Sequence, residues 1–116
     1  MSNLEHDLQH FMGGEEVYRH LFGFNYSEGV KYLAENAGAY WLLDAIFSHQ
    51  PSLRTRRLRE FQVWELTVQD GSAKLCCYED SGEPPAVTQH FVRTNFPLAK
   101  IKFYFEGGLL MLPSER

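Results

Sequence analysis

His6 and His10 stand four positions apart in a segment, residues 3–12, that we expect to form a short N-terminal helix. Positions i and i+4 share one face of a helix, so the two imidazoles have the spacing of metal ligands. A metal site requires a third ligand, and Asp7 points to another part of the helix. We therefore interpret the pair as histidines of a solvated helix face, and we predict neither a metal nor a cofactor.

Arg19, His20 and Asp44 form a second group of side chains that could do chemistry. Asp44 lies inside the apolar string YWLLDAIF, where a charge is unexpected. If the helix bends at Gly38, Asp44 lies near Trp41 and can pair with Arg19 or His20, which would fasten the N-terminal segment to the helix. Asp44 could instead orient His20 as a general base, but no matching nucleophile motif accompanies it. We predict no catalytic residue.

An arginine-rich segment lies in the middle of the chain. Pro51 to Glu60 is polar, we expect it to be a loop, and four of the eleven basic residues fall in six of its positions: Arg54, Arg56, Arg57 and Arg59. Such a cluster could hold phosphates or an acidic partner. However, the net charge is −4 and the isoelectric point is about 5.7, which gives no general attraction to nucleic acid.

The two cysteines, Cys76 and Cys77, are adjacent. On a strand, neighbouring side chains point to opposite faces, and a disulfide framework needs separated pairs. We expect two free thiols, one buried and one exposed.

The size and composition of the chain indicate one domain over residues 1–116, with 44% hydrophobic and 15% aromatic residues to form a core. No apolar run is long enough to span a bilayer, and the N-terminus lacks the basic start and apolar run of a secretory signal. We expect a cytoplasmic location and no membrane partner.

The residues that position Asp44 lie between Val30 and Gln50. The apolar residues before Gly38 form one helical stripe, whereas those after it fall roughly opposite that stripe on a straight helix. Either the chain bends at Gly38, giving helices over residues 28–37 and 39–49, or one straight helix is buried nearly all round in its second half. We favour the bend, because glycine typically ends a helix and Ser27 is a good N-cap for the first one.

From Phe61 onward, apolar and polar residues alternate with the period of a strand, interrupted by turn sequences such as Asp70-Gly71. The fold class is therefore α+β, with N-terminal helices packed on one face of a C-terminal antiparallel meander sheet of 4–5 strands. The segment Glu15 to Tyr26 lacks a clear period, and part of Val17 to Phe22 fits a strand, a short helix or an ordered loop. The last strand, Leu109 to Leu112, is either central or an edge that is open to a partner.

Four strings of the chain carry a resemblance: residues 27–35 (SEGVKYLAE), 37–44 (AGAYWLLD), 61–66 (FQVWEL) and 110–115 (LMLPSE). They resemble a family of small bacterial proteins of unknown function whose members also occur on mobile elements. The similarity extends from about Phe11 to Glu115 and is weakest in residues 51–59. It implies a soluble bacterial protein without an assigned activity, and it carries over no site residue.

The function that we predict is a non-enzymatic module that binds a protein, either an unknown one or a second copy of itself. Nucleic acid is the alternative partner, and a small metal-dependent or His/Asp hydrolase is the second alternative. The candidate binding residues include the last strand together with these side chains: Arg19, His20, Trp41, Asp44, Arg54, Arg56, Arg57 and Arg59.

Overall fold

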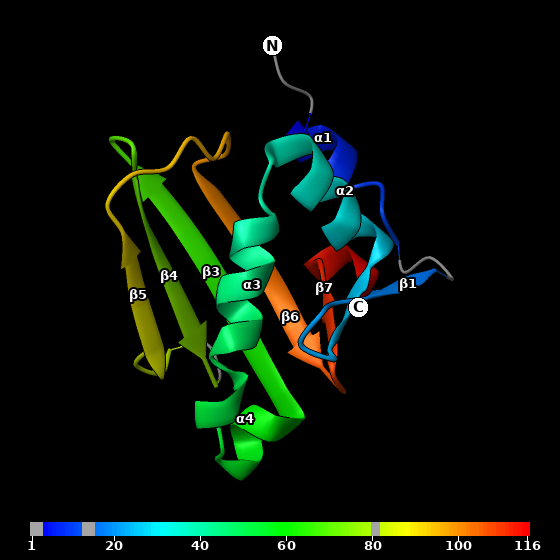
Figure 1. Cartoon of the computed structure of the whole chain (residues 1–116), viewed down its shortest axis with the longest axis vertical. Helices are drawn as coiled ribbons and strands as arrows, with labels where there is room; N and C mark the ends of the chain where they lie inside the picture. The colour runs from blue at the N-terminus through cyan, green and yellow to red at the C-terminus, as the bar shows by residue number, and fades with distance from the viewer. Residues whose placement is uncertain (1–3, 13–15, 80–81) are drawn as a thin grey trace.

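The fold consists of a seven-stranded mixed sheet with α2 and α3 on one side, in a computed structural model that describes residues 4–12, 16–79 and 82–116 (Figure 1). The strands lie in the order β1-β2-β7-β6-β3-β4-β5. Their bounds are β1 Val17–Arg19, β2 Asn25–Ser27, β3 Phe61–Gln69, β4 Ser72–Tyr78, β5 Val87–Phe91, β6 Lys100–Glu106 and β7 Leu109–Met111. The helices are α1 Leu4–Leu8, α2 Glu28–Ala37, α3 Tyr40–Ser48 and α4 Arg56–Glu60, with 3-10 turns η1 Gln50–Ser52 and η2 Pro113–Glu115.

The predicted bend in the central helical segment is confirmed. Helix α2 ends at Ala37, and Gly38 follows in the left-handed conformation, with φ 59° and ψ 41°. Ser27 caps the start of α2, where its hydroxyl accepts a hydrogen bond from the Val30 N–H at 3.2 Å. Glycine reaches the left-handed region without the steric penalty of a Cβ atom, so α3 can leave in a new direction.

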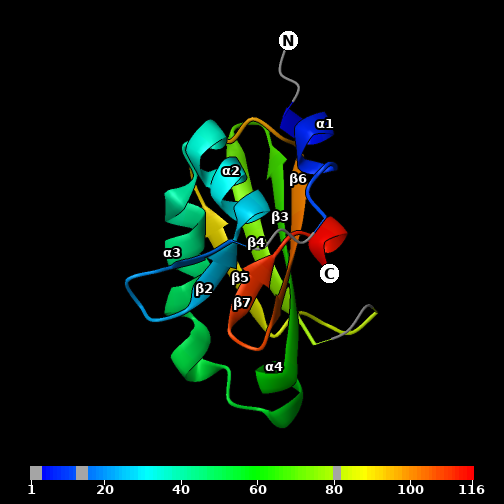
Figure 2. The same cartoon turned by 90° about the vertical axis from the view of Figure 1, so that its right-hand side faces the viewer.

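The two central helices bury their apolar faces on the same side of the sheet (Figure 2). Helix α2 buries Val30 and Leu33, and α3 buries Leu42, Leu43, Ile46 and Phe47. The largest buried side chains of the sheet, Trp64 and Phe103, are register partners on β3 and β6. Because side chains alternate along a strand, the neighbouring residues of both strands lie on the opposite, outer face.

The sheet differs from the predicted 4–5-stranded antiparallel meander. Strands β3, β4 and β5 do form a meander, but β6 crosses back to pair with β3 on the side away from β4. The hairpin of β1 and β2 adds two further strands, and β2 pairs with β7 in parallel. These strands have three residues each, too few to establish an alternating pattern in the sequence.

The structure also decides between the two alternatives for the last strand, and it corrects two further expectations. Strand β7 lies between β2 and β6, so the last strand is central in the sheet and does not offer an open edge to a partner. The arginine-rich segment is not a plain loop, because it contains η1 and the short helix α4, capped by the Thr55 hydroxyl. The helices also do not all precede the strands. In the chain, β1 and β2 lie between α1 and α2, and the 3-10 turn η2 follows β7.

Gly38→Ala should lower the free energy of unfolding by about 1–2 kcal/mol, because an L-residue is strained in the left-handed region. No atom lies within 4 Å of the position of the added Cβ, so a loss would report backbone conformation and not a clash. Urea denaturation followed by far-UV circular dichroism measures the change. Gly38→Asn is the matched control and should lose less, since asparagine tolerates this region better. Equal stability of wild type and Gly38→Ala would contradict the left-handed conformation of Gly38.

Candidate functional site

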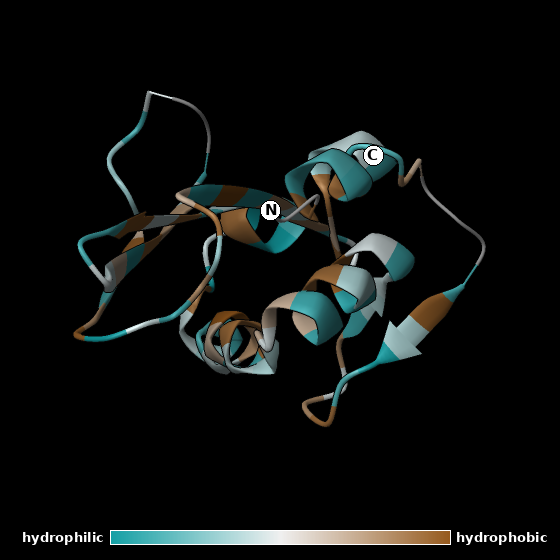
Figure 3. Cartoon of the chain, turned by 90° about the horizontal axis from the view of Figure 1, so that it is seen from above, coloured by the Kyte–Doolittle hydropathy of each residue, from teal (hydrophilic) through white to brown (hydrophobic). Residues whose placement is uncertain are grey.

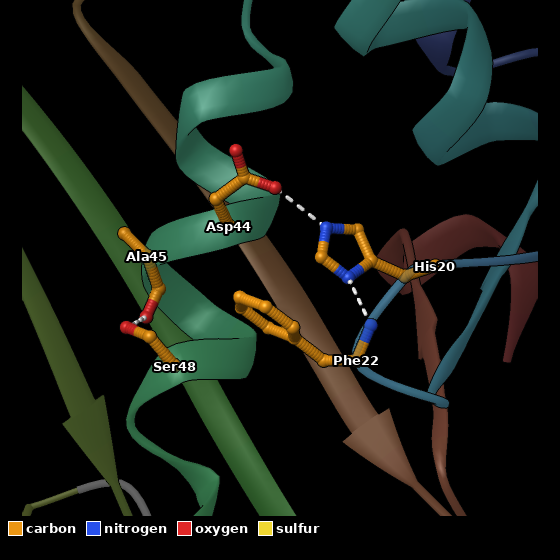
Figure 4. A network of polar contacts seen from close by, with 5 residues as sticks. All are labelled: His20, Phe22, Asp44, Ala45 and Ser48. Carbon is orange, nitrogen blue, oxygen red and sulfur yellow. Dashed lines mark hydrogen bonds and ion pairs between the residues drawn. The ribbon is translucent and has the colours of Figure 1, made fainter.

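The structure joins two of the predicted residues, His20 and Asp44, across 24 positions of the sequence (Figure 4). His20 follows β1 in the hairpin, and Asp44 projects from α3. The His20 Nε2 and Asp44 Oδ1 atoms are 2.5 Å apart. The His20 side chain is only 8% exposed, whereas that of Asp44 is 60% exposed. The pair therefore fastens the hairpin to the helix, as the structural interpretation of Asp44 predicted.

The hydrogen bonds of His20 define the tautomer of its ring. The Phe22 backbone N–H donates to Nδ1 at 3.1 Å, so Nδ1 carries a lone pair and no proton. The proton of the neutral ring is then on Nε2, which donates to the Asp44 carboxylate. Both nitrogens are thus engaged within the chain. A general base needs a nitrogen lone pair directed at a substrate, so this geometry favours a structural role for His20.

Aromatic contacts enclose the His20 ring on the side of the core. Its centroid lies 4.8 Å from that of Phe22 and 4.7 Å from that of Phe47 in α3. Phe24 stacks on Phe47 as well, at 5.4 Å. Two backbone hydrogen bonds close the turn, from His20 N–H to the Phe24 carbonyl at 2.7 Å and from Gly23 N–H to the His20 carbonyl at 2.9 Å. The hairpin is therefore braced at its base.

The tip of this hairpin carries two exposed apolar residues that the sequence analysis did not single out. Leu21 is 97% exposed and Phe22 is 54% exposed. Figure 3 shows the tip as a hydrophobic segment that projects from the body of the molecule. The available signal was the pair of large apolar residues directly before Gly23, which adopts φ +90° in the turn.

The remaining candidates near Asp44 do not join this cluster. Trp41 turns toward the far edge of the sheet, where its ring lies 5.0 Å from Phe91 and 6.4 Å from Phe96. Arg19 is exposed on β1, with its guanidinium beside Gly23. The hydrogen-bond partner of Asp44 is thus His20 and not Arg19.

The four arginines of residues 54–59 are exposed, and three of them have partners within the chain. Arg54 donates to the Pro51 carbonyl, Arg56 pairs with Glu60 at 3.3 Å, and Arg57 pairs with Glu79 at 3.6 Å. Arg59 lines a hollow beside η1 with Phe24 and Phe105. The cluster is therefore dispersed around α4 and does not converge on one point.

His6 and His10 contact each other on α1 and the turn that follows, with their Nε2 atoms 3.1 Å apart. Asp7 is engaged elsewhere, because it accepts a hydrogen bond from the Tyr32 hydroxyl at 2.8 Å. Within residues 4–12, 16–79 and 82–116, no three histidine, cysteine, aspartate or glutamate side chains are arranged to hold a metal ion. The two histidines thus lack a third ligand among the described residues.

Both cysteines are buried, which corrects the expectation that one would be exposed. Cys77 faces the helices, and Cys76 lies on the outer face with its Sγ 3.7 Å from the Thr88 hydroxyl oxygen. Burial raises the pKa of the Cys77 thiol to about 12. Cys76 is thus buried although its side chain lies on the outer face, so alternation along a strand does not imply exposure.

Asp44→Ala should lower the free energy of unfolding by about 1 kcal/mol, because the Nε2–H of His20 loses its acceptor. It should also speed the amide hydrogen exchange of residues 17–27, which the pair holds against α3. Asp44→Asn is the matched control, since its amide oxygen can still accept from Nε2 while the charge is gone. Identical behaviour of the two variants would show that the hydrogen bond does not brace the hairpin.

Native protein at pH 8 should react with a thiol reagent far more slowly than unfolded protein. The thiolate is the reactive form, and the Cys77 thiol stays protonated at this pH because burial raises its pKa to about 12. The reaction with Ellman's reagent, with and without urea, measures this difference. Rapid reaction of one thiol per chain in the folded protein would show that Cys76 is accessible to the reagent.

Two comparisons with known proteins gave no relative, since neither the curated proteins nor the solved structures include a match to this chain. Within the described residues, no helix has the length and apolar character required to cross a membrane. A family model does match residues 2–116, which is nearly the whole chain, and its description is "Family of unknown function (DUF6876)". The resemblance found in the sequence is thereby confirmed at the level of a family of unknown function, and the chain belongs to that family.

Proposed function

We propose that this protein is a non-enzymatic module that binds another protein through the tip of its β1–β2 hairpin. The observation that carries the proposal is the exposure of Leu21, at 97%, on a turn whose base is fixed by the His20–Asp44 pair. The cytoplasmic location and bacterial source expected from the sequence belong to the same proposal.

A braced apolar tip suits protein recognition for an energetic reason. An exposed leucine and phenylalanine gain free energy when a partner removes them from water, at roughly 25 cal/mol for each Å² of apolar surface. A turn that is already ordered loses little conformational entropy on binding. The hydrogen bonds from Phe22 N–H to His20 and from Gly23 N–H to the His20 carbonyl supply that order.

The surroundings of the tip define the chemistry of the partner. Asp44 uses Oδ1 for His20, and its second carboxylate oxygen makes no hydrogen bond within the described part of the chain. A fitting partner therefore offers an apolar pocket for Leu21 with a lysine or arginine at its rim. A second copy of this chain is one protein that could provide such a pocket.

Leu21→Asp should abolish retention of the partner by the immobilised protein, because a carboxylate cannot enter an apolar pocket without a large desolvation cost. Affinity capture from an extract of the source cells, quantified by mass spectrometry, measures the loss. For self-association, light scattering after size exclusion should show an oligomer in the wild type and a monomer in Leu21→Asp.

Val92→Asp is the matched control for this experiment, because Val92 is also strongly exposed, at 86%, but follows β5 at the far edge of the sheet. It should retain the same partner as the wild type. If Leu21→Asp retains every protein that the wild type captures and forms the same oligomer, the hairpin tip is not the binding site.

A further inference from the structure

The sheet has an outer face on the side opposite α2 and α3 (Figure 2). That face carries a cluster of aromatic rings that the hairpin site does not use. Phe61 and Tyr104 lie on adjacent strands with their ring centroids 5.3 Å apart. The Arg116 guanidinium lies over both rings, 4.4 Å from the Phe61 centroid and 5.6 Å from that of Tyr104. This cluster lines a hollow of about 390 Å³, with Tyr78 on its far wall and Lys102 beside it.

Positive charge adjoins the aromatic cluster along the strands. The two glutamates of this face on β3 and β6 are each paired, Glu65 with Lys100 at 3.4 Å and Glu106 with Arg116 at 3.3 Å. Lys102, in contrast, makes no ion pair within the described residues, and neither does Lys74 on β4. The outer face is therefore locally cationic, although the whole chain has a net charge of −4.

The cationic row connects two hollows. Lys102 lines the aromatic hollow and also a second one of about 460 Å³, which continues toward α1. Lys100 lies at the second hollow, whose walls are largely apolar, including Leu98 and Ile101, and whose α1 side carries the acidic Glu5. A ligand that occupies both hollows would thus be elongated and would pass Lys102 and Lys100.

We propose that this outer face binds a single-stranded nucleic acid. Bases would stack in the hollow of Phe61, Tyr78 and Tyr104, and the backbone phosphates would lie along Lys102 and Lys100. Unpaired bases have free π-faces, which aromatic side chains and arginine guanidinium planes bind regardless of sequence. A duplex hides those faces, and an acidic peptide offers carboxylates but no planar rings for the aromatic wall.

This site is separate from both the hairpin tip and the arginine-rich segment. The hairpin contacts α3 on the helical side of the sheet, whereas Tyr104 and Lys102 lie on the outer side. Arg56 and Arg57 already pair with Glu60 and Glu79. The inference goes beyond the proposed protein binding, and either can fail without the other.

Fluorescence anisotropy with a labelled single-stranded oligonucleotide of about ten nucleotides, in about 50 mM salt, tests the inference. The wild type should bind with a Kd on the order of 10 µM, weaken as salt rises, and bind a blunt duplex of the same length less tightly. Lys102→Glu and Tyr104→Leu should each weaken binding roughly tenfold, the first through lost charge and the second through lost stacking. Circular dichroism checks that both variants are folded.

Lys31→Glu is the charge-matched control, because Lys31 lies on α2 on the helical side of the sheet, and it should change the Kd by less than about twofold. Absence of binding by the wild type at low salt would overturn the inference. So would full binding by both Lys102→Glu and Tyr104→Leu, or a loss confined to Arg56→Ala plus Arg57→Ala. Inorganic polyphosphate has no bases, so its affinity should be the same for wild type and Tyr104→Leu. A loss as large for polyphosphate as for the oligonucleotide would remove base stacking and with it the proposed ligand.

Discussion

The break in the backbone at Gly38 is the constraint on which the rest of the structure depends. On a straight helix, the apolar residues of α2 and α3 would point in roughly opposite directions, and one set would face water. The left-handed Gly38 lets α2 and α3 both bury their apolar faces on one side of the sheet. The same turn of the chain leaves Asp44 on the exposed side of α3, within reach of His20. The helical layer and the braced hairpin thus share one cause.

The C-terminal segment fixes the other end of α2. The Glu115 carboxylate accepts hydrogen bonds from the Ser27 hydroxyl at 2.5 Å, the Gly29 N–H at 3.0 Å and the Leu112 N–H at 2.9 Å. A Cβ on Gly29 would lie 2.6 Å from the Leu112 side chain and 2.7 Å from the Glu115 carboxylate, so a larger residue would force these side chains to shift. A carboxylate at the start of a helix is also electrostatically favourable. Two of the four strings that carry the family resemblance, residues 27–35 and 110–115, meet here, next to the pairing of β2 with β7.

The sequence predicted those parts of the fold whose signals are local. The bend at Gly38, the Ser27 cap and the strands from Phe61 onward follow from short-range patterns and are present in the structure. The parallel pairing of β2 with β7 joins residues more than eighty positions apart, and no pattern within either short strand encodes it. The site shows the same division. The sequence narrowed the polar partner of Asp44 to Arg19 or His20. The hydrogen bonds of both His20 nitrogens depend also on the turn at Phe22, which no local sequence pattern indicates.

Strand β6 links the two proposed binding surfaces. Phe105 faces inward, where its ring lies 5.6 Å from Phe24 of the hairpin and 5.9 Å from Phe47 of α3. Its neighbour Tyr104 faces outward into the aromatic hollow, because successive residues of a strand point to opposite faces. A packed strand in the middle of a sheet holds such neighbours in fixed positions. A protein at the hairpin tip and a nucleic acid on the outer face would therefore not compete for space, and the sheet would hold them on its two sides at a set separation.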